Sequence, residues 1–449
     1  MEHKRISLLF IATALITLIM GVLFGMIGGL QYIVPEFLKE YLSFQKTRPL
    51  HVTLVITWIF TGAVGGVYYY LPEIAQRKLF SINLARTHYA LFIITGIAIL
   101  ICYFSGNFGG REYLEFPPIL AIPMLFSWIL FAINFILTIR KKVSDWPIYL
   151  WMWSTGVLFF LITFGESYLW TLPYFRDNII RDVTVQWKAN GSMVGSWNML
   201  VYGTGFYIME QISGDKKTAT APITYFFYFL GLTNLMFNWG HHTYIVPAAP
   251  WIKNVAYIIS MTELLILGSI ILNWRKSLSV AKKNLHSVPY RFIAAADIWI
   301  FLNLTLAILM SIPAINKYTH GTHITVAHAM GSTIGINTMI LFASLYYIFE
   351  RNDGAVKNRK TRIGFFVVNL SLILFWVTLI ISGIVKAMEV ENGMAFQKMM
   401  LQLQPLFKML NSAGLGIFVG LFLLSIPLLT KFSTIILSTD KLLSKKSKL

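Results

Sequence analysis

The chain has 449 residues, of which 56% are hydrophobic and only 12% are charged. Charged residues make up about a quarter of a water-soluble globule, so this composition excludes a soluble enzyme and indicates an integral membrane protein. The net charge of +18 does not indicate a nucleic-acid partner, because the basic residues fall in alternate linkers. The single cysteine, Cys102, excludes an intrachain disulfide, a C-x-x-C-H haem-attachment motif and a paired-cysteine copper centre. Electrons for any redox reaction must therefore come from another subunit or a small molecule.

Apolar runs of roughly 20 residues predict an all-α bundle of about twelve membrane-spanning helices in a single domain, residues 1–449. The predicted spans lie near 6–30, 50–71, 88–105, 117–139, 147–170, 189–209, 222–243, 252–273, 291–312, 322–349, 363–387 and 412–436. The linkers are short and rich in Pro, Gly or charged residues. The first run follows Lys4 and Arg5 and is long enough to span, so it is interpreted as a helix and not as a signal peptide.

Basic residues are concentrated in every second linker, whereas the other linkers hold most of the acidic residues. By the positive-inside rule, the basic linkers and both termini face the cytoplasm. The basic linkers and tail include Lys78, Arg86, Lys141, Lys217, Lys283, Arg359 and the C-terminal lysines.

Several side chains that can bind metals lie inside or at the ends of the predicted spans, where ionisable groups are rare and costly. They are His51, His241, His242, His320, His323, His328 and Met330. The predicted orientation brings His51, the His241–His242 pair and His328 to a similar depth near the outer side, which favours a shared metal or haem site. His320 and His323 are interpreted either as partners of a haem propionate or proton path, or as interfacial histidines in contact with water.

His328 and Met330 are two positions apart on a predicted helix, so their side chains point about 200° away from one another. They cannot bind the same atom. They can address two different cofactors on opposite sides of this helix.

Four motifs carry a resemblance to a known family. They are Arg48-Pro49-Leu50-His51, Gly110-Arg111-Glu112-Tyr113-Leu114-Glu115, Gly240-His241-His242, and Tyr318-Thr319-His320-Gly321-Thr322 followed by His328. In order and spacing the chain resembles the large catalytic subunit of bacterial nitric oxide reductase, which belongs to the haem–copper oxidase superfamily. The resemblance extends over nearly the whole chain and implies the same twelve-helix fold, in a bacterial inner membrane.

The resemblance implies a role for each motif residue. His328 would bind the iron of a high-spin haem b, and His51 would bind that of a low-spin haem b. His241 and His242 would hold a non-haem metal, expected to be iron. Glu112 or Glu115 would hold calcium, a hard-oxygen role that suits a carboxylate. Glu263 matches a buried acid near the haem–metal site, a candidate catalytic residue that would hydrogen-bond a site residue or relay a proton. A surface or structural role for these three glutamates stays open.

The chain departs from the family pattern at the metal site. In the family, the sixth span carries a third metal-binding histidine and, four residues later, a glutamate. Here Asn190 and Val194 occupy these positions, and Asn198 replaces a second glutamate. An amide oxygen is a poorer ligand than imidazole for such metals, and valine is not a ligand. Asn190 is therefore retained only as a weak metal ligand.

Met330 replaces a family histidine. A His51/Met330 pair can hold a haem iron, since His/Met ligation occurs in cytochromes and raises the potential. The alternative is that Met330 only fills space and that the low-spin haem is weakened or absent.

The expected function is reduction of NO to nitrous oxide, with electrons from a periplasmic cytochrome c subunit or a quinol, in contact with membrane lipid and without nucleic acid. The altered ligands leave two alternatives: a nitric oxide dismutase-like enzyme, and a haem protein that binds NO or O2 without turnover. The few acids inside the spans, chiefly Glu166 and Glu263, disfavour a proton-pumping oxygen reductase.

Overall fold

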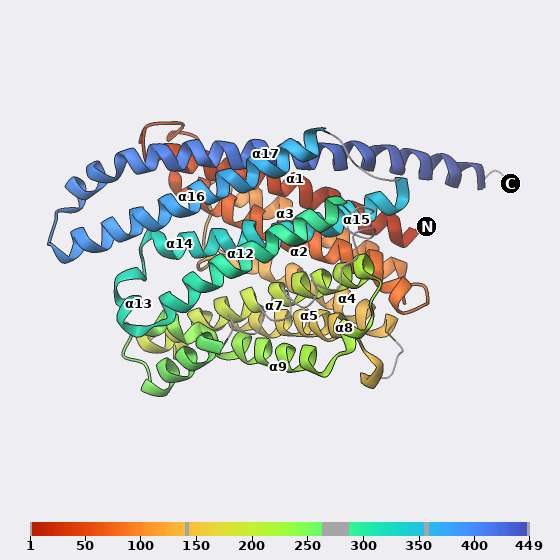
Figure 1. The fold of residues 1–449 in the computed structure, drawn as a ribbon, viewed down its shortest axis with the longest axis horizontal. Coiled ribbons are helices and arrows are strands. Elements are labelled where there is room, and N and C mark those ends of the chain that lie inside the picture. Colours follow the sequence, from red (N-terminus) through yellow and green to blue (C-terminus); the bar gives the residue numbers. More distant parts are fainter. Residues whose placement is uncertain (1, 140–142, 263–286, 354–358, 447–449) are drawn as a thin grey trace.

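The computed structural model describes residues 2–139, 143–262, 287–353 and 359–446. Long helices run side by side along one axis, and both termini lie at the same end of the bundle (Figure 1). We call this the terminal end and the opposite one the distal end. Within the described residues the only extended pairing is an isolated bridge between Arg111 and Leu114, so the predicted all-α membrane fold is confirmed.

The helix bounds agree with most of the predicted spans. The long helices are α1 (Glu2–Gln31), α2 (Phe44–Ile74), α3 (Ile82–Phe104), α4 (Ala121–Thr138), α5 (Ile148–Glu166), α7 (Ile179–Ser213), α9 (Pro222–Phe237), α12 (Ser287–Ser311), α15 (Met339–Asp353), α16 (Arg359–Glu391) and α17 (Phe396–Lys446). The short helices are η1 (Pro118–Leu120), η2 (Val143–Asp145), η3 (Leu169–Thr171), α6 (Pro173–Arg176), α8 (Lys217–Thr220), η4 (Asn238–Thr243), α13 (Pro313–Thr319), α14 (His323–Met330) and η5 (Gly331–Thr338).

Nine helices in the described part of the chain are long and apolar enough to cross a membrane. Three further helical segments lie where spans were predicted. The sixth predicted span is α7, the seventh is α9, and the eighth begins in the helical residues 250–262. Twelve spans therefore fit the bundle. The rest of the eighth span, including Glu263, lies outside the described residues.

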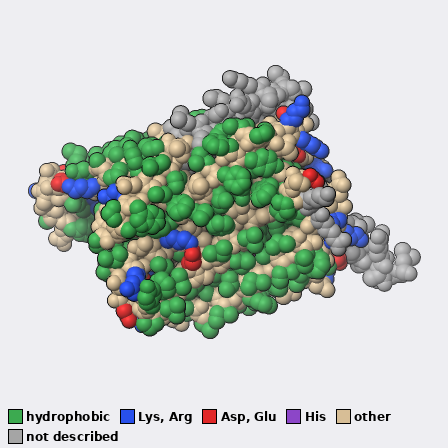
Figure 2. Space-filling view, turned by 90° about the horizontal axis from the view of Figure 1, so that it is seen from below, with side chains coloured by type: hydrophobic (Ala, Val, Ile, Leu, Met, Phe, Trp, Pro, Cys, Tyr) green, Lys and Arg blue, Asp and Glu red, His purple; other side chains and the backbone are tan. Residues whose placement is uncertain are grey.

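The outer surface shows why the chain needs a membrane. Figure 2 shows a broad hydrophobic middle, with most Lys, Arg, Asp and Glu side chains toward the two ends. Large apolar side chains are exposed on the outer helices, such as Ile94 on α3 and Leu370 on α16, each 66% exposed. A surface of this kind is stable against hydrocarbon and not against water.

Ion pairs tie linkers together at each end of the bundle. At the terminal end, Arg86 pairs with Glu2 at 3.0 Å and Arg351 with Glu73 at 2.7 Å. At the distal end, Arg111 pairs with Asp182 at 2.8 Å. Alternate linkers therefore gather at opposite ends, as expected for a chain that crosses a membrane repeatedly.

The tenth span differs from the uniform α-helix predicted over 322–349. It begins as α14, widens into the π-helix η5 directly after Met330, and continues as α15. π-helical turns are rare and often lie beside functional sites. This π-helix packs closely on α12: a Cβ added at Gly335 would lie 2.5 Å from the Trp299 ring. Glycine is needed there because the two helices approach so closely.

Two further boundaries differ from the prediction. Helix α9 ends at Phe237, and the His241–His242 pair lies in the following 3-10 helix η4, not on a continuous span to 243. The last span begins at Phe396, well before 412, because Met399 and Leu403 are buried in a second apolar cluster near the distal end. Apolar contacts thus extend the helix beyond the membrane-length segment.

Substitution of Gly335 by alanine tests the close packing of α12 on the π-helix. We expect a lower Tm in detergent, corresponding to about 1–3 kcal/mol, because the added methyl overlaps Trp299. The matched control is Gly96→Ala on α3, where no atom lies within 4 Å of the added carbon. That variant should keep or raise the Tm, and an unchanged Tm for Gly335→Ala would contradict the packing described here.

Candidate metal centre

A cluster of histidines forms at the distal half of the bundle, where η4, α7 and the α13–α14 turn meet. The His241 and His242 rings lie 4.3 Å apart between centroids. Trp187 of α7 stacks on His242 at 4.3 Å with the planes only 4° apart. His320 contacts both Trp187 and His242 edge-on, each at 5.9 Å. Three separate segments of the chain therefore bring imidazole and indole rings to one place.

His241 is held in one orientation by its neighbours. Its Nδ1 lies 2.9 Å from Asn238 Oδ1, and the Ser260 hydroxyl donates to the same oxygen at 2.6 Å. An amide oxygen only accepts, so Nδ1 carries the proton and Nε2 keeps its lone pair. Hydrogen bonding of the second ring nitrogen to such an acceptor is the usual arrangement of a metal-bound histidine.

His328 faces this cluster from α14. It is close enough to His241 and His242 for their charges to interact. The backbone of Asn303 lies within hydrogen-bonding reach of the His328 ring, whereas His242 Nδ1 is buried and makes no hydrogen bond within the described residues. Buried ring nitrogens without partners are costly, and a bound metal or haem is one way to satisfy them.

His51 lies on α2 against α1, away from this cluster in sequence and in its contacts. Its Nδ1 donates to the Gly21 backbone carbonyl at 2.7 Å, which leaves Nε2 as the unprotonated nitrogen. Gly25 permits the approach of α1, since a Cβ there would lie 2.6 Å from His51 Nδ1. Met330 is the last residue of α14 and is partly buried against both apolar clusters. Each side chain can bind one side of a haem iron.

Helix α7 offers weak donors at the positions where the resemblance led us to expect strong ones. Asn190 is 2% exposed, and its Oδ1 already accepts a hydrogen bond from Gln186 Nε2 at 3.0 Å. Val194 packs against the main apolar cluster. Asn198 accepts from Asn337 Nδ2 of the π-helix at 3.0 Å. Asn190 therefore bonds within α7, whereas Asn198 joins α7 to the π-helix, and α7 contains no histidine.

The cluster is not a completed metal site. Among the residues described by the structure, no three His, Cys, Asp or Glu side chains are arranged as ligands of one ion. Burial lowers the pKa of His320, in the turn outside the spans, and so favours its neutral ring. His323, three residues later, turns away and contacts Phe407 at 5.6 Å.

The two glutamates expected to hold calcium lie in the loop after α3 and share an arginine. Arg48 donates to Glu112 at 2.7 Å and to Glu115 at 2.8 Å. Glu112 is exposed, whereas the Glu115 side chain is 14% exposed and its Oε2 is buried without a hydrogen-bond partner within the described residues. Burial raises the pKa of the Glu115 carboxyl, and Arg48 opposes that shift.

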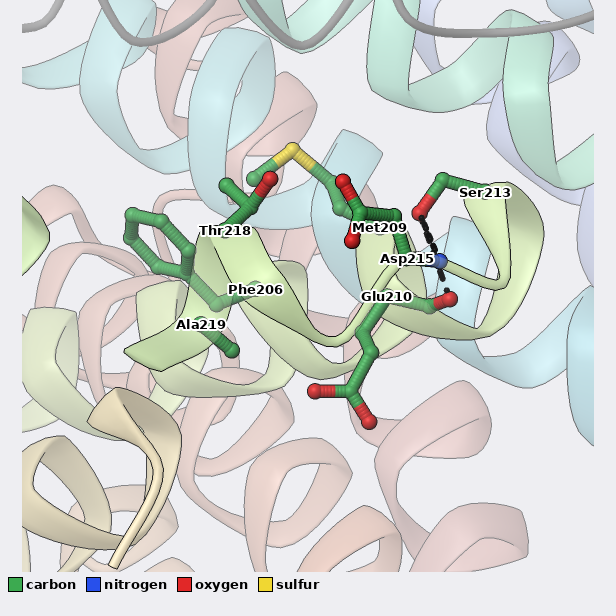
Figure 3. A pocket seen from close by; sticks show the side chains of 7 residues that line it. All are labelled: Phe206, Met209, Glu210, Ser213, Asp215, Thr218 and Ala219. Carbon is green, nitrogen blue, oxygen red and sulfur yellow. Dashed lines mark hydrogen bonds between the residues drawn. The ribbon is translucent and has the colours of Figure 1, made fainter. Parts of the chain in front are cut away.

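A small cavity lies at the other end of α7, about 30 Å from Asn190 at 1.5 Å per residue. It is lined by Phe206, Met209, Glu210, Ser213, Asp215, Thr218 and Ala219 (Figure 3). This cavity is therefore separate from the histidine cluster and belongs to the terminal end.

The helical membrane bundle, together with the family that its sequence matches, defines a membrane oxidoreductase of the haem–copper oxidase type. Residues 5–416 match the family described as cytochrome c and quinol oxidase polypeptide I, and the chain belongs to that family. The predicted superfamily membership is thereby confirmed. Proteins of this family bind haem and serve respiratory electron transport.

The named relatives include a nitric oxide reductase subunit and cytochrome c oxidase subunits. One nitric oxide reductase subunit, from Stutzerimonas stutzeri, is 26% identical over 414 residues, covering 86% of this chain and 85% of that protein. The first subunit of cytochrome c oxidase from Rhodobacter capsulatus is 24% identical over 400 residues, covering 82% and 73%. A chain of a heme-copper terminal oxidase dimer has the same fold, with a TM-score of 0.77 at 14% identity, covering 96% and 84%.

Four features of the site were missed by sequence reasoning. Trp187 and Asn238 support the histidine pair, Ser260 supports Asn238, and the π-helix follows Met330. Asn238 precedes His241 by three residues, a helical spacing that was available as a signal. Ser260 and Trp187 come from other elements, and no local pattern marks them.

Proposed function

We propose that this chain reduces nitric oxide. Two NO molecules, two electrons and two protons give one nitrous oxide and one water. The supporting observation is that His328 lies beside the His241–His242 pair, with His241 held by Asn238 as a metal ligand would be. Similarity that extends over 85% of a nitric oxide reductase subunit favours NO over O2 as the substrate.

The residues present fit two haem b groups and one non-haem metal. His328 would bind the high-spin haem, and its Nδ1 lies in a buried environment. His51, with Nε2 left free by its bond to Gly21, and Met330 would hold the low-spin haem. His241 and His242 would hold the metal, with iron as the expected ion. The haem–metal pair would supply electron transfer to bound NO, and the chain's residues orient these groups and exclude water.

Electrons are proposed to enter at the distal end, where His51 and the histidine cluster lie, from a cytochrome c subunit or a quinol. The segregated linkers support insertion in a bacterial inner membrane with both termini in the cytoplasm. Glu263, the proposed proton-relaying acid, lies outside the described residues.

Glu115, and not Glu112, is the better calcium ligand of the pair. Its buried Oε2 is free, while its other oxygen and Glu112 are paired with Arg48. Calcium takes oxygen ligands at about 2.3–2.6 Å, and a buried carboxylate oxygen is a suitable donor.

A dismutase-like reaction, in which two NO give N2 and O2, is the second candidate. The altered α7 favours it, because Asn190 is committed to Gln186 and Val194 supplies no donor. This reaction needs no external electrons.

Removal of the His328 imidazole tests the haem assignment. We expect the His328→Ala variant to lose the high-spin haem signal and keep the low-spin signal, because His51 and Met330 are untouched. Pyridine haemochrome and optical spectra of the purified chain would measure this. Retention of both signals would refute the assignment, and His323→Ala serves as the control.

Anaerobic NO consumption separates the proposed reactions. With a reductant, a reductase consumes NO and releases nitrous oxide, and without one it stops after the stored electrons are used. Gas analysis by mass spectrometry would measure both conditions. Donor-independent consumption that releases O2 would favour dismutation, and haem binding of NO without any consumption would leave only the binding function.

Substitution of Glu115 tests the calcium proposal. A chelator should lower the Tm of the native chain, because the ion stabilises the folded state that binds it. We expect Glu115→Gln to have a lower Tm that the chelator no longer changes, since the carboxylate is lost. Glu112→Gln is the matched control and should keep the chelator effect; the same response in all three proteins would contradict the proposal.

A further inference from the structure

We infer that Trp58 of α2 and Thr338 of the π-helix η5 are positioning residues for the low-spin haem. Their hydrogen bond holds the π-helix, and the π-helix sets the direction in which the Met330 side chain leaves the tenth span. This role rests on the proposed ligation of that haem by His51 and Met330.

One hydroxyl carries the shape of the wide turn. Thr338 Oγ1 accepts from Trp58 Nε1 at 2.9 Å and donates to the Thr333 carbonyl at 2.8 Å. A threonine in an α-helix reaches the carbonyl four residues back, as Thr95 does with Leu91. Thr338 reaches five residues back, which is the π-helical spacing. Trp58 and Thr338 are each 1% exposed, so water does not replace either bond.

Two neighbouring helices hold the rest of the π-helix. Asn303 Nδ2 of α12 donates to Ser332 Oγ at 2.8 Å. A Cβ on Gly331 would lie 2.2 Å from Asn303 Oδ1, so glycine lets this amide approach the first turn. Asn337 Nδ2 donates to Asn198 Oδ1 of α7 at 3.0 Å. The first turn is therefore tied to α12 and the later part to α7, and the tryptophan–threonine bond ties the end to α2.

The wide turn sets the angle between the two halves of the span. A π turn takes about one residue more than an α turn, so it rotates α14 by about 100° relative to α15. Helix α14 is docked separately on α16, since a Cβ on Gly383 would lie 2.5 Å from Ile324. Met330 is the last residue of α14, directly before the π-helix, and packs against both apolar clusters. The direction of Met330 therefore depends on this turn.

Helix α2 connects the two proposed ligands. His51 and Trp58 are seven residues apart on α2, which is about two turns, so they lie on the same face of the helix about 10 Å apart along its axis. His51 would bind one side of the iron, while Trp58 holds the turn that directs Met330 to the other side. One helix face thus sets both axial positions.

Variants of the Thr338 hydroxyl test this role through haem ligation, independently of turnover. Thr338→Val keeps the side-chain shape, but it leaves the Trp58 N–H without an acceptor, which disfavours the native turn by about tenfold or more. We expect loss of the His/Met low-spin signature in optical and magnetic circular dichroism spectra. The reduction potential should also fall, because methionine ligation raises it. Haem per chain, measured as the pyridine haemochrome, should stay native because His51 is retained.

Conservative and matched variants separate positioning from general stability. Thr338→Ser keeps the hydroxyl and should keep the native spectrum, and Trp58→Phe should match Thr338→Val. Met330→Ala gives the spectrum of a haem without methionine. Thr95→Val and Trp128→Phe each remove a buried hydrogen bond elsewhere, to the Leu91 and Val157 carbonyls, and should leave the haem spectrum and potential native.

A native spectrum and potential in both Thr338→Val and Trp58→Phe would overturn the inference, whatever their Tm. Failure of Thr338→Ser to keep the native spectrum would assign the effect to packing and would also overturn it. A native spectrum in Met330→Ala would do so too, because the methionine would not be a haem ligand, while NO reduction could still be observed. A His/Met signature that depends on Thr338 in a chain that consumes no NO would uphold the inference and reject the proposed function.

Discussion

A histidine inside a membrane bundle is oriented most firmly when a protein group satisfies one ring nitrogen and leaves the other available, and His51 and His241 meet this constraint. Water is not present to complete the hydrogen bonds, so a protein group must do so. The Gly21 carbonyl performs this role for His51, and the Asn238 amide, shared with Ser260, performs it for His241. Each acceptor keeps the proton on Nδ1, and Nε2 therefore stays unprotonated on the opposite side of the ring. The same bonds also link α1 to α2 and η4 to Ser260.

Helix α7 lacks the metal ligands expected from the resemblance, and one of its side chains instead bonds to a neighbouring helix. The Asn198–Asn337 hydrogen bond joins α7 to the π-helix, and Trp58 of α2 donates to Thr338 at its end. Gly335 lets α12 approach from the third side. The wide turn after Met330 is therefore tied to three neighbouring helices. Helix α7 has few strong metal donors, but its side chains still hold the surrounding helices in place. Asn198 bonds to the π-helix and Val194 packs against the main apolar cluster, so both contribute packing and not metal coordination.

Membership of the oxidase polypeptide I family accounts for the fold and for haem-based redox chemistry, but not for the substrate. The relatives include enzymes named for nitric oxide and for cytochrome c oxidation. The features that bear on the proposed substrate are local: Asn190, Val194 and Met330 depart from the residues expected from the resemblance, and His320 lies at the edge of the histidine pair. The substrate is therefore a question of the residues around the histidine pair and not of the fold.

The sequence by itself determined the helical membrane class, nearly all span positions and the identity of His51, His241, His242 and His328 as the residues of interest. Apolar run length and the rarity of buried imidazoles are local properties, so they can be predicted without a structure. Only the tertiary structure decided that Glu115 Oε2 is left without a hydrogen-bond partner among the described residues, that a π-helix follows Met330, and that His320 contacts His242 while His323 contacts Phe407. These depend on contacts between helices distant in sequence, for which a single chain carries no local pattern.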